Sequence, residues 1–238
     1  MKKYTAVLFD LDGTLIPFDQ EEFIKEYFKE LVYKMVPLGC DKDLLVKAIW
    51  MGTDAMLSND GSKTNKEAFF EVFGTVMNKK LEDIEPLFNE FYLNEFDRVK
   101  SVLKYKADRR EFIKALKEKG VNIVLATNPL FPKEAVETRL SWIGLKGSDF
   151  SYITTYENSS YCKPNLNYYR EILHKTGYDA LECIMIGNNT LDDMQASRIG
   201  LDVYLVTDNL ENELGEDISV YKHGSFEDMA EMICRIYQ

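Results

Sequence analysis

Residues 7–16 read VLFDLDGTLI, an apolar run that passes directly into two aspartates, a glycine and a threonine. The apolar part is typical of a buried strand, whereas Asp and Gly are common turn-forming residues. Two interpretations are open at this point. The stretch is an ordinary strand that ends in a turn, or it holds the carboxylates of Asp10 and Asp12 at a sheet edge for chemistry.

Similar short apolar runs recur along the chain and predict the strands of a sheet. Together with the first run they lie at residues 4–9, 122–127, 151–155, 183–187 and 203–207. Helical patterns separate the later runs, at residues 108–120, 132–144 and 164–177. Two of these begin with proline and all three end in glycine, which is typical of helix boundaries. Alternation of apolar strands with helices predicts a parallel sheet that is covered on both faces.

The long stretch at residues 17–100 interrupts this alternation, because its periodicity is helical and it contains no convincing strand. Its first pattern places apolar side chains on one helix face, namely Phe23, Tyr27, Leu31 and Met35. Helix start signals follow at Asp41, at Thr64 and at Glu82 or Asp83. We therefore predict an α/β fold with a Rossmann-like, doubly wound parallel sheet. Residues 1–16 and 101–238 form its core domain, and residues 17–100 form an all-helical insert.

Charge excludes one class of partner. The 238 residues include 29 Lys and Arg against 40 Asp and Glu, a formal net charge of −11. Non-specific binding of nucleic acid depends on positive charge that meets phosphates, so no nucleic-acid partner is expected. A small anionic substrate would need a locally positive pocket in this negative field.

The cysteines and the N-terminus bear on the cellular location. The four cysteines are scattered without paired spacing, so reduced thiols are expected rather than a zinc site or disulfides. The apolar run after the N-terminal lysines stops at Asp10, too early for an export signal. No run approaches the roughly 18 apolar residues of a membrane-spanning helix. We expect a cytoplasmic monomer with no membrane partner.

Polar side chains follow the predicted strands at the points where ligands bind in parallel α/β sheets. Asp10 and Asp12 follow the first strand, and Thr127 and Asn128 follow the second. The sequence GNNTLDD at residues 187–193 follows the fourth strand, and Lys163 precedes the helix that begins at Pro164. Each element alone is weak evidence, but their joint order along the chain favours a reactive site.

These motifs resemble those of the haloacid dehalogenase-like (HAD) superfamily. DLDGT corresponds to its first motif, Thr127 to the second, Lys163 of CKPN to the third and IGNNTLDD to the fourth. The resemblance spans the whole chain, because the helical insert lies where the family has a helical cap domain. It implies an aspartyl-phosphate mechanism and a phosphatase that uses Mg2+ as its cofactor.

The resemblance also implies a role for each matching residue. Asp10 would be the nucleophile, and Asp12 would protonate the leaving oxygen and later activate water. The substrate phosphate would be bound by Gly13, Thr14, Thr127, Asn128 and Lys163. A hard cation such as Mg2+ would offset the repulsion between carboxylates and phosphate.

Motif four departs from the family pattern, which usually has Asp after the glycine. This chain has Asn188 there, which can offer a carbonyl oxygen to a metal but no charge. The predicted metal ligands are therefore Asp10, Asp12 and Asn188, with the remaining carboxylate from Asp193 or Asp192. Spacing favours Asp193.

The predicted function is a Mg2+-dependent phosphatase that hydrolyses a small phosphate monoester. Asp12 argues against carbon–halogen cleavage, because a departing halide needs no proton. A phosphomutase of the same family remains an alternative, as does a catalytically weak binding or regulatory protein with the same fold. The partner is a small phosphorylated metabolite, and sugar phosphates, nucleotides and phosphoglycolate all remain open.

Overall fold

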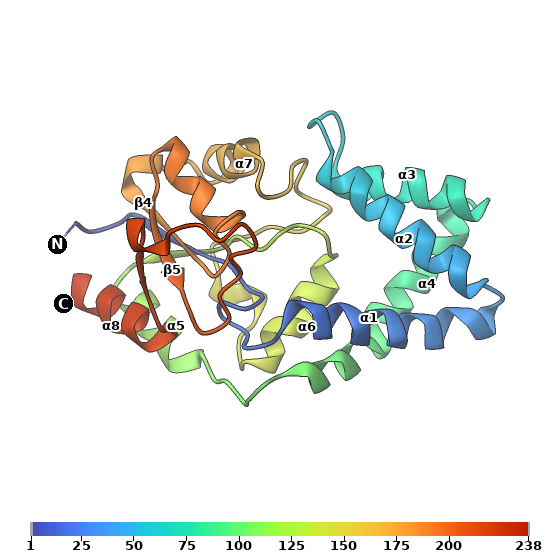
Figure 1. The fold of residues 1–238 in the computed structure, drawn as a ribbon, viewed down its shortest axis with the longest axis horizontal. Coiled ribbons are helices and arrows are strands. Elements are labelled where there is room, and N and C mark those ends of the chain that lie inside the picture. The colour runs from blue at the N-terminus through green and yellow to red at the C-terminus, as the bar shows by residue number, and fades with distance from the viewer. Residues whose placement is uncertain (1, 238) are drawn as a thin grey trace.

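The computed structural model describes residues 2–237, and its centre is one sheet of six parallel strands (Figure 1). The strands lie in the order β3-β2-β1-β4-β5-β6. Their bounds are β1 Ala6–Phe9, β2 Asn122–Leu125, β3 Tyr152–Ile153, β4 Cys183–Gly187, β5 Asp202–Val206 and β6 Lys222–Gly224. This is the order of a doubly wound Rossmann-like sheet, and the predicted fold class is confirmed.

Alternate residues of the central strands enter two separate apolar clusters, one on each face of the sheet. Val7 and Phe9 belong to the larger cluster, which also holds Ile113 of α5 (Arg110–Glu118) and Ile233 of α8 (Phe226–Ile236). Ala6 and Leu8 point the other way, toward the cluster that contains the apolar face of α7 (Leu166–Thr176). The sheet is therefore buried on both sides, which accounts for the unbroken apolar runs in the sequence.

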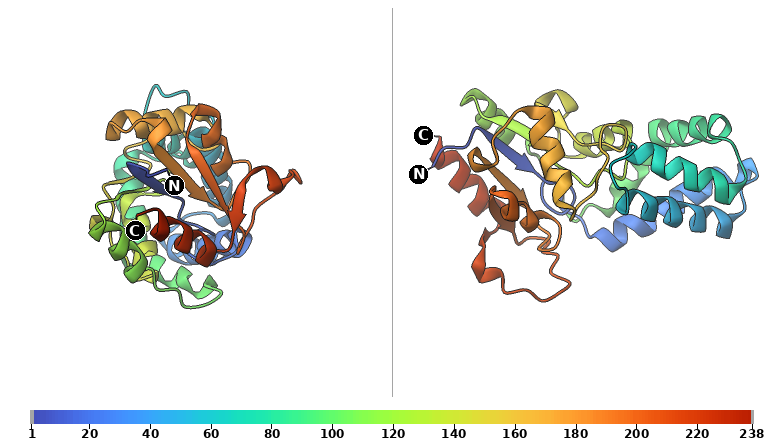
Figure 2. Two further views of the ribbon diagram at one scale, coloured as in Figure 1. Left: turned by 90° about the vertical axis from the view of Figure 1, so that its left-hand side faces the viewer. Right: turned by 90° about the horizontal axis from the view of Figure 1, so that it is seen from above.

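Helices α1 to α4 lie together at the end of the molecule opposite the two termini (Figures 1 and 2). Their bounds are α1 Gln20–Met35, α2 Lys42–Leu57, α3 Asn65–Met77 and α4 Leu81–Asn94. The remaining helix is α6, Lys133–Trp142. Short 3-10 helices occupy Val36–Leu38, Phe96–Val102, Gly147–Asp149, Ala180–Glu182, Asp193–Ile199 and Ile218–Val220. No strand lies within residues 17–100.

The helix starts agree in part with the sequence. Asp41 and Thr64 are the N-caps of α2 and α3, and each side chain accepts a backbone N–H, as expected. The prediction for α4 is wrong by two or three residues, because Lys80 is its N-cap and makes no side-chain cap bond. Glu82 and Asp83 instead lie in the first turn, where carboxylates are stabilised by the helix dipole.

Strand and helix ends differ by a few residues from the predicted ranges. β4 has the predicted bounds, whereas β1, β2 and β3 are shorter and α7 begins at Leu166 rather than Pro164. β6 was not predicted, because its three residues Lys-His-Gly carry no apolar pattern. In residues 2–237 we find no helix with both the length and the apolar composition to cross a membrane.

Candidate active site

A polar pocket lies at the carboxyl ends of the strands, beside the start of α1. Its empty volume is about 500 Å³. It is lined by Asp10, Asp12, Gln20, Thr127, Asn128, Leu130, Phe131, Lys163, Asn188, Asn189, Asp192, Asp193 and Glu211. The structure thus brings together nearly all residues that the sequence singled out, although they come from four separate segments of the chain.

Lys163 is the central cation of this pocket and is almost completely buried. Its Nζ donates to Asp10 Oδ1 at 2.7 Å and to Asp193 Oδ1 at 2.6 Å. Burial by itself lowers the pKa of Lys163, but the two carboxylates outweigh burial and raise the pKa above its usual range. The side chain is therefore a fixed positive charge between motif one and motif four.

Asp10 occupies the first position after β1, and the parallel ladder fixes its backbone. Its N–H donates to the carbonyl of Ile186 on the neighbouring strand β4 at 2.9 Å. Burial raises the pKa of Asp10 to about 8; Lys163 opposes this rise, whereas Asp193 and Asp12 add to it. A further cation near this carboxylate would favour its ionised, nucleophilic form.

Asp12 is paired with Arg139 of α6, a residue that no sequence motif points to. Nη1 of Arg139 donates to Asp12 Oδ2, and the guanidinium lies 4.7 Å from the ring centroid of Phe131. Burial raises the pKa of Asp12, while Arg139 opposes the rise. Asp12 Oδ1 and Arg139 Nη2 are buried and have no hydrogen-bond partner in the described chain. This leaves Asp12 Oδ1 available to a ligand.

Gly13 and Thr14 do not line the pocket but lie behind it. Gly13 has φ of 77°, and a Cβ there would collide with the side-chain amide of Asn188, so glycine is required. Thr14 Oγ1 donates to Asn188 Oδ1 at 2.9 Å. Both residues therefore support the loops that carry Asp12 and Asn188, and their predicted contact with phosphate stays a prediction.

Thr127 and Asn128 are held at the end of β2 by neighbouring segments. The hydroxyls of Thr154 and Tyr168 donate to the Thr127 carbonyl at 2.6 and 2.9 Å. Asn128 Oδ1 accepts the backbone N–H of Lys163 at 3.2 Å. These contacts join motif two to motif three and fix Thr127 at the pocket wall.

The side chains of motif four differ in their hydrogen-bond partners and in whether they remain open to the pocket. Asp193 is engaged on both oxygens, by Lys163 and by the backbone N–H of Asn189 at 3.1 Å. Asp192 lines the pocket, and burial raises its pKa to about 6. Asn188 Nδ2 donates to the carbonyl of Asn209 at 2.7 Å. Asn188 is thus held on both sides of its amide and connects the loops after β1, β4 and β5.

Glu211 brings one more carboxylate to the pocket, from the loop after β5. Backbone hydrogen bonds join this loop to residues 188–190, and Asn189 Nδ2 donates to the Glu211 carboxylate at 2.7 Å. Burial and the nearby charges of Asp193 and Asp12 raise the pKa of Glu211. Its sequence surroundings, an acidic stretch at residues 208–217, are typical of a solvated loop and give no sign of this position.

The donor set fits a magnesium ion. Among residues 2–237, no three acidic, cysteine or histidine side chains are grouped so that they would ligate one ion by themselves. Mg2+ commonly uses only one or two carboxylates, together with waters and substrate phosphate oxygens. The pocket has five carboxylates against one lysine, and Asp12 Oδ1 is buried without a partner. Asp10 and Asp12 would supply the carboxylate oxygens, with motif four and Glu211 beside them.

Comparison with known proteins identifies the class of enzyme. Residues 7–206 match the haloacid dehalogenase-like hydrolase family, so the chain belongs to that family and is a hydrolase. A curated relative, the pyrophosphatase PpaX of Bacillus velezensis, is 25% identical over 199 residues, which cover 84% of this chain and 81% of the relative. The family and enzyme class expected from the motifs are confirmed.

Solved structures support the fold. The HAD phosphatase from Thermococcus onnurineus has a TM-score of 0.59 at 20% identity, with 98% of each chain covered. A 2-haloacid dehalogenase from Pseudomonas syringae has a TM-score of 0.61 at 16% identity, with 99% of each chain covered. One is a phosphatase and the other a dehalogenase, so the choice of chemistry depends on the residues of the pocket.

Proposed function

We propose that this hydrolase is a Mg2+-dependent phosphatase that cleaves a small phosphate monoester through an aspartyl-phosphate on Asp10. The proposal rests on one observation: a single pocket contains Asp10, Asp12, Thr127 and Lys163. Lys163 Nζ lies 2.7 Å from Asp10 Oδ1. Asp12 favours phosphate esters over carbon–halogen bonds, because an alkoxide needs a proton on leaving and a halide does not.

The reaction divides into two displacements at phosphorus. The Asp10 carboxylate forms a bond to phosphorus while the ester P–O bond breaks, and Asp12 gives its proton to the departing alkoxide to yield the alcohol. Water then attacks the same phosphorus as Asp12 takes up its proton, which releases phosphate and the free Asp10 carboxylate. Lys163 and Thr127 stabilise the negative charge on the transferring phosphoryl group.

Magnesium would lower the charge repulsion between the phosphate dianion and the carboxylates of Asp10 and Asp12. We further propose that helices α1 to α4 serve as the cap domain, residues 17–100, over a core of residues 1–16 and 101–238. Gln20 supports this role, because it lies at the start of α1 and lines the polar pocket.

A phosphate-release assay with phenyl phosphate tests the proposal. We expect release to depend on added Mg2+ and to be abolished in Asp10→Asn, whose amide is nearly isosteric but cannot attack phosphorus. Asp54→Asn on the exposed side of α2 serves as the matched control and should retain full activity. Substantial turnover by Asp10→Asn, or turnover that persists after chelation of all metal, would contradict the proposed mechanism.

A further inference from the structure

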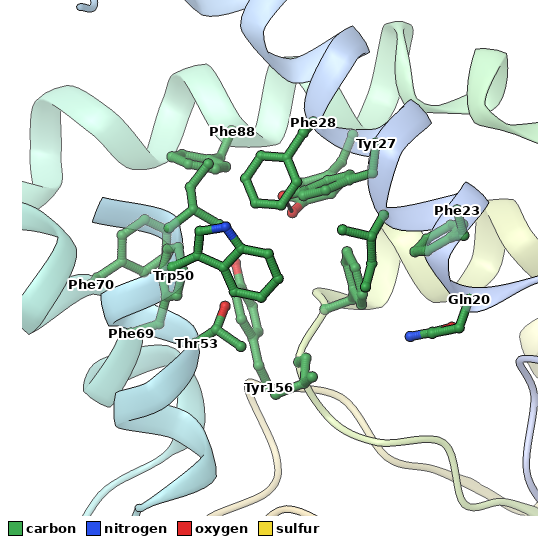
Figure 3. Close-up of a pocket in the computed structure, with 15 residues that line it drawn as sticks. Gln20, Phe23, Tyr27, Phe28, Trp50, Thr53, Phe69, Phe70, Phe88 and Tyr156 are labelled. Carbon is green, nitrogen blue, oxygen red and sulfur yellow. Dashed lines mark hydrogen bonds between the residues drawn. The ribbon is translucent and has the colours of Figure 1, made fainter. Parts of the chain in front are cut away.

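A second cavity lies among α1, α2, α3 and α4 and adjoins the polar pocket (Figure 3). Its empty volume is about 720 Å³, part of which is open to solvent. Gln20, Leu130 and Phe131 line both this cavity and the polar pocket. Phe131 also stacks on Arg139, which binds Asp12, so the aromatic wall begins beside the predicted general acid.

The walls of this cavity are aromatic and carry no charge. Figure 3 shows rings from α1, α2, α3 and α4 gathered around the open space, among them Phe28, Trp50 and Phe88. The polar lining groups are Gln20, Thr53 and tyrosine hydroxyls, and two of those hydroxyls, of Tyr27 and Tyr92, are hydrogen-bonded to each other at 2.9 Å. An anionic or sugar-like group here would lose its hydration with few partners in return.

The nearest charges make the cavity still less suited to an anion. Tyr156 forms part of the wall, and after burial the charges that raise the pKa of its hydroxyl are those of Glu157, Glu85 and Glu134. Arg139 lies behind the ring of Phe131 and is already paired with Asp12. A second phosphate or a carboxylate in this cavity would find no cation among its lining residues.

The cavity is also accessible rather than sealed in a core. The side of α2 that faces it carries Trp50, which is 46% exposed and whose ring lies 5.3 Å from that of Phe28. An exposed tryptophan at the mouth of an aromatic cavity is typical of a binding site for an apolar group.

We propose that this cavity binds the leaving group, and that the substrate is a phosphate monoester of an uncharged, apolar alcohol, either aryl-alkyl or alkyl. This inference rests on the proposed phosphatase function. With the phosphate at Lys163 and the ester oxygen at Asp12, the alcohol extends past Phe131 into the aromatic cavity. Burial of its carbon surface then contributes to binding of the transition state as well as of the substrate.

Three monoesters of primary alcohols test the proposal, because they differ mainly in what the leaving group presents to the cavity. They are ethyl phosphate, 3-phenylpropyl phosphate and 2-phosphoglycolate, assayed for phosphate release with Mg2+. We expect kcat/KM to rise about fourfold for each buried methylene-sized group, and therefore at least about tenfold from ethyl to 3-phenylpropyl phosphate. We expect 2-phosphoglycolate to be hydrolysed more slowly than ethyl phosphate.

Trp50→Ala locates the effect in the cavity. It should reduce the preference for 3-phenylpropyl over ethyl phosphate several-fold. Because Trp50 is exposed, its truncation should leave the fold intact, and the thermal midpoint checks this. Tyr33→Ala, on the exposed side of α1, is the control aromatic truncation and should keep the preference unchanged.

The outcomes separate this inference from the function on which it rests. Equal kcat/KM for ethyl and 3-phenylpropyl phosphate, or a preference that Trp50→Ala does not alter, contradicts the apolar substrate class and leaves a phosphatase. A higher kcat/KM for 2-phosphoglycolate than for 3-phenylpropyl phosphate also contradicts the apolar substrate class and leaves a phosphatase. No phosphate release from any of the three esters contradicts the proposed function itself, and the inference with it.

Discussion

Asp12 serves the proposed reaction twice, as acid and then as base, and a buried arginine fixes its position. The Arg139 side chain is fully buried, binds one oxygen of Asp12 and lies over the ring of Phe131. A guanidinium is planar and always charged, so it holds a carboxylate in one orientation better than lysine does. Arg139 therefore acts as a positioning residue for the proposed general acid.

If Arg139 positions Asp12, substitution of either residue should slow hydrolysis more for an ester with a poor leaving group than for one with a good leaving group. Asp12→Asn should slow hydrolysis of ethyl phosphate by roughly 100- to 10,000-fold and of phenyl phosphate by less, because phenolate leaves without a proton. Arg139→Met should show the same bias in smaller measure, with little change in KM. Kinetic assays on both esters measure the bias, with the exposed Arg98→Met as control. Equal fractional losses on both esters would count against the assignment.

We propose that Asn188 and Glu211 together replace the aspartate of the usual family pattern, Asn188 as a hydrogen-bonding residue and Glu211 as the carboxylate. Asn188 donates to the Asn209 carbonyl and accepts from Thr14, whereas Glu211 presents a carboxylate to the pocket. Asp at position 188 would lose the donor and place a negative charge against a carbonyl oxygen. The structure therefore favours Asn188 as a hydrogen-bonding residue of the loops rather than as a weakened metal ligand.

A metal titration of variants tests this division. Asn188→Asp should not lower the Mg2+ concentration for half-maximal activity and should destabilise the fold by about 1–3 kcal/mol. Glu211→Gln should raise that Mg2+ concentration several-fold. The rise in thermal midpoint on addition of Mg2+ gives a second readout that needs no turnover. Tighter Mg2+ binding by Asn188→Asp would instead show that position 188 contacts the ion.

At the scale of elements, the start of α3 ties the helical segment to the loops after β2 and β3. Asn65 is fully buried, and its Nδ2 donates to the carbonyl of Pro129 at 3.2 Å while its Oδ1 accepts from Asn59 at 2.9 Å. Its backbone N–H donates to the carbonyl of Ser159 at 2.8 Å. A buried polar side chain with these partners fixes α3 beside the loop that carries Thr127 and Phe131.

Truncation of this side chain should destabilise the protein. Asn65→Ala leaves the buried Pro129 carbonyl and the Asn59 amide with fewer partners, so we expect a loss of about 1–3 kcal/mol in the free energy of unfolding. Denaturant titration measures it, and Asn94→Ala at the exposed end of α4 is the control. Losses of equal size in the two variants would refute the docking role of Asn65.

The sequence predicts best those helices and strands whose apolar residues in the sequence are the residues buried in the structure. β4 is buried at all five residues and is apolar except for its terminal glycine, so its bounds follow from composition. β6 pairs at the sheet edge through its backbone, and its exposed residues leave no apolar signal. The start of α4 at Lys80 has no side-chain cap, so the sequence rules for N-caps could not find it.

At the scale of the whole molecule, the parallel topology explains both the success and the limits of the motif prediction. Asp10, Thr127 and Asn188 each follow a central strand, and neighbouring parallel strands bring their carboxyl ends to one edge. Arg139 lies on helix α6, which follows β2, and Glu211 lies in the loop after β5. The contact of Arg139 with Asp12 and the position of Glu211 in the pocket depend on tertiary packing, and in the sequence both resemble ordinary surface charges.

The negative net charge opposes the binding of a phosphate dianion in the pocket. A molecule with a formal charge of −11 repels a phosphate dianion, and the five carboxylates of the pocket add to this effect locally. Among the described residues that line the pocket there is one lysine, Lys163. In the proposed mechanism a metal ion is therefore needed to bring Asp10 and phosphate together, and Asp10 carries the phosphoryl group.

Chemical trapping of the phosphoryl group on Asp10 tests this central claim most directly. In Asp12→Asn, phenyl phosphate should still phosphorylate Asp10, whereas attack by water is slowed, so the acyl phosphate accumulates. Borohydride reduces an acyl phosphate to an alcohol but leaves free carboxylates intact. After an acid quench and reduction, peptide mass spectrometry should find homoserine in place of Asp10, only with substrate and Mg2+. Release of phenol without homoserine at that position, or with homoserine at another aspartate, would contradict the account.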